Sequence, residues 1–363
     1  MSKRSLLVLL SIALTATVSV GLTSCGDDPD PVTPTPTPDP GIVTPTPDST
    51  PTNYAWPTWT DINGKNVRLL SMSEQYYDEI DNYFYTYDQA GHLSSVFGDG
   101  VKWTSQNTFT IKSEYDDGSY TITVTLNNDG LISTLIYEEI ENDGEYEKAT
   151  VTYTYNSNKQ LIRINDVGEW SEDDGDDKGT YSAIEDYTWS NGNLTATLYS
   201  ASEEYYDEGV KETEEDSGSS AVTYSSQQNP TRQFPYALAY EGIDASFPEL
   251  AALGLFGIGP KNLPSSATWS YSTTSGIYFI YALNNNGTIA SEKYYYYNYN
   301  SNYTYNIAYN YGDSTDNGDN GDNGGGFNPG GGNNNDDIYK KVPQKQKLSM
   351  PHRIHRRHTT RQK

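Results

Sequence analysis

The chain has 363 residues and a formal net charge of −26, with 49 acidic residues against 23 basic ones. This excess of negative charge argues against DNA or anionic lipid as a partner of the folded part, because both would repel an acidic surface. The sequence holds a single cysteine, which excludes internal disulfides. Its 33 tyrosines favour β-structure, since aromatic side chains suit a pleated surface.

An apolar segment at the start of the chain predicts export. Residues 5–22 are apolar and follow Lys3 and Arg4, a pattern typical of a signal peptide over residues 1–24. Cys25 comes next, and the run before it resembles the lipobox of bacterial lipoproteins, in which the cysteine becomes the lipidated N-terminus. The lipobox residues are Leu22, Thr23 and Ser24. We therefore expect a lipid anchor at Cys25; the alternative is a chance cysteine after an ordinary signal peptide.

The segment after Cys25 favours the cell surface. Asp27, Asp28 and Asp30 follow the cysteine, and acidic residues at this position resemble the signal that sends Bacteroidetes lipoproteins to the outer face of the outer membrane. The alternative is a polar linker at the periplasmic face of that membrane. Segment 25–53 is rich in Pro and Thr, so it favours an extended linker that holds a domain up to ~75 Å from the membrane.

A short hairpin motif recurs through the centre of the chain. Each full copy begins with an aromatic or apolar residue, continues with turn-forming residues, and ends with a branched apolar residue six positions on. The copies, two of them imperfect, lie at 87–93, 126–132, 155–161, 189–194, 224–230 and 283–289. Asn, Asp and Gly in the turns tolerate the positive φ of tight hairpins. The irregular spacing of the copies argues against a solenoid of fixed period.

The flanks of these turns alternate with period two. Between Tyr120 and Leu126, apolar residues alternate with threonine, and the pattern recurs from Thr150 to Tyr155. One face of each strand is therefore apolar and the other hydroxylic, as in antiparallel sheets solvated on one side. We predict an all-β domain over residues 54–311, in which a meander of antiparallel hairpins forms a curled sheet or an open barrel. The pattern leaves closure of the sheet undecided.

The stretch from Tyr85 to Leu93 carries a resemblance in its Tyr-x-Tyr-Asp-x-x-Gly-x-Leu pattern. It resembles the YD repeats, or RHS repeats, of large bacterial shell-forming proteins. It is more similar to a family of Bacteroidetes lipoproteins of unknown function with a porin-like β fold, which also carry Leu-Gly-Leu and Lys-Asn-Leu-Pro-Ser-Ser segments, here residues 253–255 and 261–266. The resemblance covers about residues 65–311. It implies a β fold on a surface lipoprotein and implies no activity.

A single helical signal interrupts the β pattern at residues 247–256. Ser246 suits the helix cap, Pro248 suits the first turn, and a glycine at 254 or 257 suits the end. We expect this short helix to cover an open end of the sheet as a hydrophobic plug. A ligand gate is the alternative.

Two acidic stretches are expected to form exposed hairpin tips. The stretches are 173–179 and 202–218. The first comes near the spacing of a calcium loop, with Asp174, Asp176 and Glu185 at positions 1, 3 and 12. Lys178 takes position 5, where an oxygen ligand belongs, so a solvated loop is the preferred interpretation and calcium the alternative. No other cofactor is expected.

The composition changes after residue 311. Residues 312–338 are rich in Gly, Asn and Asp and read as a linker, whereas residues 339–363 hold nine Lys or Arg and no acidic residue. The second segment also holds three of the four histidines, at positions 352, 355 and 358. We expect a disordered basic tail, either free or docked on the acidic domain. Binding of an anionic polymer, or of metal through the histidines, is the alternative.

No catalytic pattern stands out in the sequence. His92 is the single histidine of the β domain, and the zinc, nucleophile-elbow and phosphate-loop patterns are missing. We therefore predict a protein that is not an enzyme. The alternative is a glycoside hydrolase that uses two of the many carboxylates.

The preferred hypothesis for function is a surface-anchored lipoprotein that acts as a non-catalytic binding module for a glycan or a host polymer. Tyrosine and tryptophan faces suit sugars and protein interfaces. One alternative is a structural or assembly lipoprotein that binds an outer-membrane protein partner through a sheet edge. The second alternative is an integral outer-membrane β-barrel, which needs an outward apolar band that alternating threonines do not supply.

Overall fold

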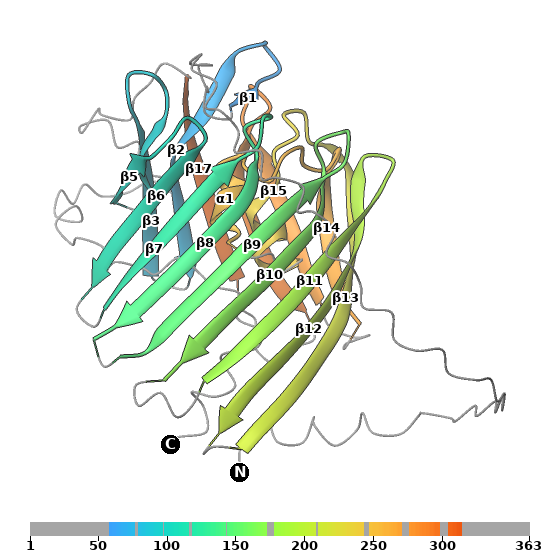
Figure 1. Ribbon diagram of the computed structural model, residues 1–363. Helices are drawn as coiled ribbons and strands as arrows, with labels where there is room; N and C mark the ends of the chain where they lie inside the picture. The colour runs from blue at the N-terminus through green and yellow to red at the C-terminus, as the bar shows by residue number, and fades with distance from the viewer. Residues whose placement is uncertain are drawn as a thin grey trace, which may run out of the picture. The chain divides into compact units, whose positions relative to one another are not determined.

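The computed structural model is all-β over the part of the chain that it describes, as the sequence predicts (Figure 1). The described residues are 58–76, 79–96, 98–115, 118–142, 144–172, 178–207, 210–242, 247–270, 276–297 and 304–313. The strands are β1 (Trp59–Thr60), β2 (Asn66–Tyr76), β3 (Glu79–Tyr87), β4 (Leu93–Val96), β5 (Asp99–Trp103), β6 (Thr108–Tyr115), β7 (Gly118–Leu126), β8 (Ile132–Glu141), β9 (Tyr146–Tyr155), β10 (Leu161–Ser171), β11 (Lys178–Ser190), β12 (Asn193–Asp207), β13 (Val210–Gln228), β14 (Asn262–Trp269), β15 (Gly276–Leu283), β16 (Ile289–Tyr297) and β17 (Thr304–Asp313). Two helical turns accompany them, the π-helical turn η1 (Leu238–Gly242) and the α-helix α1 (Glu249–Ala252).

The strands close into a barrel. Each strand from β2 to β16 pairs antiparallel with the next one along the chain, as the predicted meander requires. β17 then pairs with β2, from Tyr305 opposite Tyr76 to Asp313 opposite Val67, which completes the ring. Of the 17 strands, β1 only adds two residues beside β2, so sixteen form the wall. The structure therefore decides between a curled sheet and a barrel in favour of a closed barrel.

All copies of the hairpin motif lie at one end of the barrel. In an antiparallel meander every second turn falls at the same end. Five copies connect an odd-numbered strand to the next even-numbered one, from β3 and β4 through to β15 and β16, and the copy at 224–230 lies at the end of β13, where the chain enters the long connection to β14. We call this the motif end. The even-numbered strands run from the motif end toward the opposite end.

Four of the six motif turns share one hydrogen-bond pattern. In the copy at 126–132, Asn127 N–H donates to Leu131 O (2.7 Å), and Gly130 N–H donates to Asn127 O (3.0 Å). Gly130 has a φ of 75°, and the strand register shifts beside the turn. This is a type I turn followed by a bulged residue in the left-handed region, a position that favours glycine. The same pattern recurs at 88–92, 156–160 and 284–288, and also at 61–65 and 141–145, which the motif does not include.

Five of the six copies end in a branched apolar residue that is a core anchor, whereas the copy at 224–230 ends in the exposed Pro230. The buried anchors are Leu93, Ile132, Leu161, Leu194 and Ile289. Aromatic side chains of the following hairpin bind the backbone of an anchor. Trp103 Nε1–H donates to Leu93 O (2.9 Å), and Trp189 Nε1–H donates in the same way to Leu161 O (2.7 Å). Neighbouring hairpins are thus joined through the aromatic and branched positions as well as through the strand ladders.

The connection from β13 to β14 fills the motif end. Residues 229–242 and 247–261, which we call the plug, contain η1 and α1. Figure 1 shows α1 between the front and back walls of the barrel. Large apolar plug residues that are almost fully buried are Phe234, Phe247, Leu255 and Phe256. The interior of the barrel is therefore a packed core at this end.

The plug is bonded to the wall on two sides. Ile132 N–H, at the start of β8, donates to Leu255 O (3.1 Å). Gln233 Nε2–H donates to the hydroxyl of Tyr311 in β17 (3.0 Å). The predicted short helix near 247–256 is confirmed as the four-residue α1. Pro248 is its N-cap and does not lie in the first turn as expected, and the expected cap Ser246 lies outside the described residues. The contacts of α1 are those of the expected hydrophobic plug.

The two faces of the wall differ in polarity. Tyr120, Ile122 and Val124 of β7 are buried, whereas Thr121 and Thr123 between them point outward. The same alternation in the other strands gives an interior of mainly apolar and aromatic side chains with some buried carboxylates, and an outer wall rich in threonine, serine and charged residues. Exposed large apolar residues include Ile80, Phe84, Ile140, Val167, Leu198 and Ile280, which come from six positions on five strands. Single apolar residues of this kind are ordinary on a solvated surface.

Among the described residues, no helix has both the length and the apolar character needed to cross a membrane.

Candidate functional site

The inner wall between β8 and β12 carries acidic and aromatic side chains toward the opposite end. Strand register places Glu139 of β8 beside Glu147 of β9, and Glu147 beside Trp170 of β10. Tyr181 of β11 lies beside Glu203 of β12 in the same way. The alternation of each strand puts these side chains on the inner face. We call these five residues the acidic–aromatic wall.

Hydrogen bonds from aromatic side chains stabilise the buried carboxylates of this wall. Tyr137 OH donates to Glu139 Oε2 (2.5 Å), and Tyr115 OH donates to Glu139 Oε1. Trp170 Nε1–H donates to Glu203 Oε1 (2.7 Å). An unpaired buried carboxylate would be strongly destabilising, so these donors are what permits acidic residues inside the barrel.

Burial and these contacts keep the nearby tyrosines protonated. Desolvation raises the pKa of Tyr137, and its hydrogen bond with Glu139 raises it further. At Tyr205, the hydrogen bond that its hydroxyl donates to Glu212 Oε2 (2.6 Å) is the largest cause of a raised pKa, followed by burial. A phenol that stays protonated remains a hydrogen-bond donor. This region of the interior therefore combines carboxylate acceptors with fixed hydroxyl donors.

Two glycines inside strands make room for the aromatic rings of the wall. A Cβ on Gly168 of β10 would lie 2.5 Å from the ring of Tyr181, and a Cβ on Gly179 of β11 would lie 2.7 Å from Trp170 Nε1. Glycine weakens the interior of a strand, and it often marks a place where another group approaches closely. The two glycines therefore allow the rings of Tyr181 and Trp170 to pack directly against the backbone of the neighbouring strand.

Glu139 and Glu147 are adjacent carboxylates of the kind that the glycoside hydrolase alternative needs. Both are buried, and they lie directly opposite each other on neighbouring strands. Both oxygens of Glu139, however, accept hydrogen bonds from tyrosines, which fits a structural network better than an acid that protonates a leaving group. The glycoside hydrolase alternative gains no support from this pair, and the absence of catalysis stays a prediction.

Of the three candidate calcium ligands, the structure describes Glu185, and its surroundings give the calcium loop no support. Glu185 lies inside β11, is buried, and accepts a hydrogen bond from Tyr187 OH. Asp174 and Asp176 lie outside the described residues. Within the described part of the chain, no group of three His, Cys, Asp or Glu side chains is placed to hold a metal ion.

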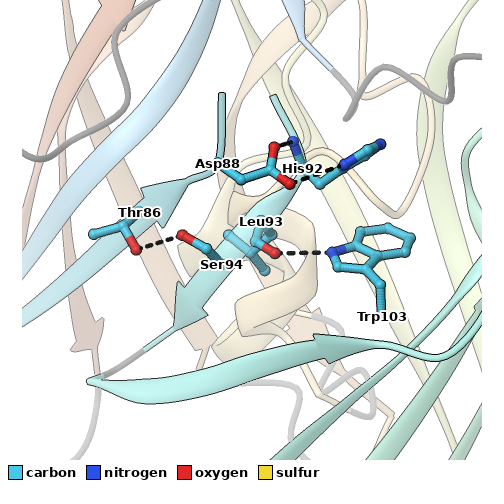
Figure 2. Close-up of polar contacts among 6 residues, drawn as sticks. All are labelled: Thr86, Asp88, His92, Leu93, Ser94 and Trp103. Atoms are coloured by element: carbon cyan, nitrogen blue, oxygen red, sulfur yellow. Dashed lines mark hydrogen bonds and ion pairs between the residues drawn. The ribbon is translucent and has the colours of Figure 1, made fainter. Parts of the chain in front are cut away.

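The hairpin around His92 is a stabilised turn (Figure 2). Asp88 Oδ1 accepts a hydrogen bond from His92 N–H (2.9 Å), and Asp88 Oδ2 lies 3.1 Å from His92 Nδ1. Desolvation alone would raise the pKa of Asp88, but the hydrogen bonds from His92 outweigh it and lower that pKa. The imidazole also packs against Trp103, with 5.2 Å between ring centroids.

The two hydroxyls of this hairpin bond each other. Thr86 Oγ1 lies 2.8 Å from Ser94 Oγ, and Figure 2 shows this pair apart from the imidazole of His92. A nucleophile relay needs a hydroxyl within hydrogen-bond reach of the base. His92 is therefore explained as a part of the turn, in agreement with its lone position in the sequence.

Other predicted residues lie outside the described part of the chain. They are Cys25, the lipobox residues Leu22, Thr23 and Ser24, the acidic residues Asp27, Asp28 and Asp30, the linker 312–338 apart from its first two residues, and the basic tail 339–363. Lipidation, surface export and the roles of the tail stay predictions.

Sequence reasoning missed the acidic–aromatic wall. The stretch 202–218 is predicted as an exposed tip, which is right for residues 210–217 of β13 but wrong for Glu203, whose side chain is buried. The missed signal is a tyrosine two positions from a carboxylate in an alternating strand, because residues i and i+2 share a face. The pairs are Tyr137 with Glu139, Glu185 with Tyr187, and Glu203 with Tyr205.

The chain is similar in structure to two porin-like proteins of Bacteroides. No family model matches the chain, and no curated protein matches it. A porin-like protein from Bacteroides uniformis has a TM-score of 0.42 and 16% sequence identity over 71% of this chain and 100% of its own. A porin-like protein from Bacteroides vulgatus has a TM-score of 0.42 and 13% identity over 67% of this chain and 98% of its own.

Proposed function

We propose that this chain is a surface lipoprotein, anchored through Cys25, whose plugged barrel acts as a non-catalytic binding module for a glycan or a host polymer. The observation that supports the tethered form is the polarity of the outer wall. Threonine, serine and charged side chains alternate with buried ones along the strands. A wall of this kind suits water, and a domain in water needs a separate anchor to stay at a membrane.

Ion pairs on the outer wall add to this argument. The guanidinium of Arg163 donates to both carboxylate oxygens of Asp186 (2.6 and 2.8 Å) between β10 and β11. Lys148 Nζ lies 2.6 Å from Glu138 Oε1 between β9 and β8. In water such exposed pairs change stability little, whereas charged side chains on a lipid-facing wall are destabilising.

An integral outer-membrane barrel is the second candidate, and topology is the observation that favours it. Sixteen antiparallel strands, each paired with its neighbour in sequence, close into a ring. Single-chain bacterial outer-membrane barrels have an even number of antiparallel strands joined in this way. The outer wall, however, lacks a continuous apolar band along the described strands.

The assembly alternative has less support than either candidate. It relies on a bare sheet edge to which a protein partner adds a strand. Every strand from β2 to β17 has a strand neighbour on both sides, but some of these pairings cover only part of a strand. Among the described strands, edges of this kind include the two-residue β1 and residues 79–84 of β3, 112–115 of β6 and 210–218 of β13.

Removal of the lipidated cysteine is expected to separate the two candidates. Cys25→Ala should move the protein from the membrane fraction to the soluble fraction, because the polar outer wall offers no other hold on a bilayer. Fractionation of cells followed by an alkaline wash of the membranes measures the change. Ser24→Ala is the matched control, since it keeps a small residue at the expected cleavage site. Retention of the Cys25→Ala protein in washed membranes would contradict the lipid-tethered barrel and favour the integral outer-membrane barrel.

A thermal-shift screen of the chain without its signal peptide tests the binding role. We expect a saturable rise in melting temperature with one class of glycan, because aromatic faces stack on sugar rings and carboxylates accept hydrogen bonds from sugar hydroxyls. Tyr181→Ala should abolish that rise if the acidic–aromatic wall holds the ligand. Tyr278→Ala, which removes a half-exposed ring from β15, should leave it unchanged. No rise with any glycan would remove the proposed ligand class.

A further inference from the structure

One wall residue bonds the backbone of the plug directly. Glu292 lies in β16 and is only 2% exposed. Its carboxylate accepts hydrogen bonds from Tyr236 N–H (3.1 Å) and Ala237 N–H (2.8 Å), the two residues that precede η1. A third donor is the hydroxyl of Tyr309 in β17 (2.8 Å). A single side chain therefore fixes the start of the helical turn in the plug to two strands of the wall.

The groups that face this carboxylate carry no charge. They are Tyr281 of β15 and Tyr309 and Tyr311 of β17, and burial raises the pKa of each of these tyrosines. Burial also raises the pKa of Glu292 from 4.5 to about 7, although its three hydrogen bonds oppose the rise. Glu292 thus titrates near neutrality at the junction of the plug and the wall.

We propose that Glu292 is a pH-sensitive latch that holds the plug against β16 and releases it more readily as the pH rises. While the latch is closed, the carboxyl is buried and binds its proton more tightly than a carboxyl in water. When the plug separates from β16, the carboxyl meets water and loses that proton between pH 4.5 and about 7. The closed state is therefore favoured below this window, and its advantage is lost as the pH rises through it.

Hydrogen exchange of the full chain measures the latch directly. The amides of Tyr236 and Ala237 donate to Glu292, so they exchange only when the latch opens. After correction for the intrinsic rate at each pH, their protection should fall by up to about tenfold per pH unit between about pH 5 and 7 and then level off, as release of one proton requires. Protection that is constant across this window in the wild-type chain overturns the proposal.

Two variants separate the latch from a general effect of pH. Glu292→Gln keeps the shape of the side chain but cannot ionise, so the pH dependence of these two amides should disappear. Glu139→Gln is the matched control, since Glu139 is also buried but its donors belong to the wall. It should leave the pH dependence of the plug amides unchanged. Loss of pH dependence in both variants, or in neither, would contradict the assignment to Glu292.

A third variant tests the sign without removing the carboxyl. Tyr309 OH donates to Glu292 and lowers its pKa. Tyr309→Phe removes this donor, so the midpoint of the fall in protection should move to a higher pH. A midpoint that stays in place or moves to a lower pH would show that a different group titrates. None of these measurements requires the proposed ligand or the lipid anchor.

Discussion

Gly257→Ala is expected to lower the melting temperature of the barrel by roughly 6–12 °C. Gly257 has a φ of 80°, which an alanine adopts only with strain, and a Cβ there would lie 2.2 Å from the carbonyl oxygen of Lys159. That carbonyl also accepts a hydrogen bond from Ile258 N–H (2.9 Å), so it cannot withdraw without breaking a contact between plug and wall. Backbone strain and overpacking together should destabilise the fold by about 3 kcal/mol.

Gly64→Ala provides the control for Gly257→Ala. Gly64 lies in the turn before β2 with a φ of 82°, but a Cβ there would meet nothing within 4 Å. Its replacement should cost only the backbone strain, about 1 kcal/mol. Thermal unfolding of both variants, followed by circular dichroism, measures the difference. Equal melting temperatures would show that the contact between Gly257 and Lys159 does not limit stability.

The local structure of the motif could be predicted from the sequence because its causes are local. Asn127 and Gly130 form their turn through hydrogen bonds within five residues, and the alternation on either side fixes which residues share a face. Lys159 shows the limit of this reasoning. Lys159 occupies the position that glycine takes in the other turns, with a φ of 59°. The copy at 155–161 can therefore be recognised only by the spacing of its first and last residues, because its turn lacks the glycine.

Closure of the barrel could not be predicted in the same way. It depends on the pairing of β17 with β2, whose residues lie more than 200 positions apart in the sequence. Alternation says which side chains share a face, but an open curled sheet and a closed barrel bury the same face. The alternation within β2 or within β17 therefore does not indicate that these two strands pair with each other.

The acidic–aromatic wall could not be predicted from the sequence because acidic residues are generally expected at the surface. Acidic residues are rarely buried unless they are paired, so an acidic stretch is ordinarily assigned to the surface. Glu203 is buried because Trp170, 33 positions earlier in the chain, donates a hydrogen bond to it. Trp170 and Glu203 come close only through the register of β10, β11 and β12. This register cannot be predicted from the composition of a single strand.

Phe256→Ala is expected to destabilise the barrel by about 3–5 kcal/mol, the usual effect of removing a buried aromatic side chain. Phe256 is fully buried in the plug. Its ring lies 5.7 Å from that of Tyr153 in the wall and 5.9 Å from that of Phe234 in the plug. The substitution should leave a cavity between plug and wall, because both neighbouring rings are held by their own elements. Denaturant unfolding followed by intrinsic fluorescence measures the loss.

Phe84→Ala is the matched control for this loss, since it removes the same side chain from the outer face of β3, where Phe84 is 56% exposed. It should change stability by less than about 1 kcal/mol, because most of that ring already meets water. A large loss in the first variant with a small loss in the second would show that the plug and the barrel unfold together. If Phe256→Ala instead unfolds at the wild-type denaturant concentration, the plug does not belong to the cooperative core. The strands would then have to hold the ring closed through their own pairing and the remaining inward-facing side chains.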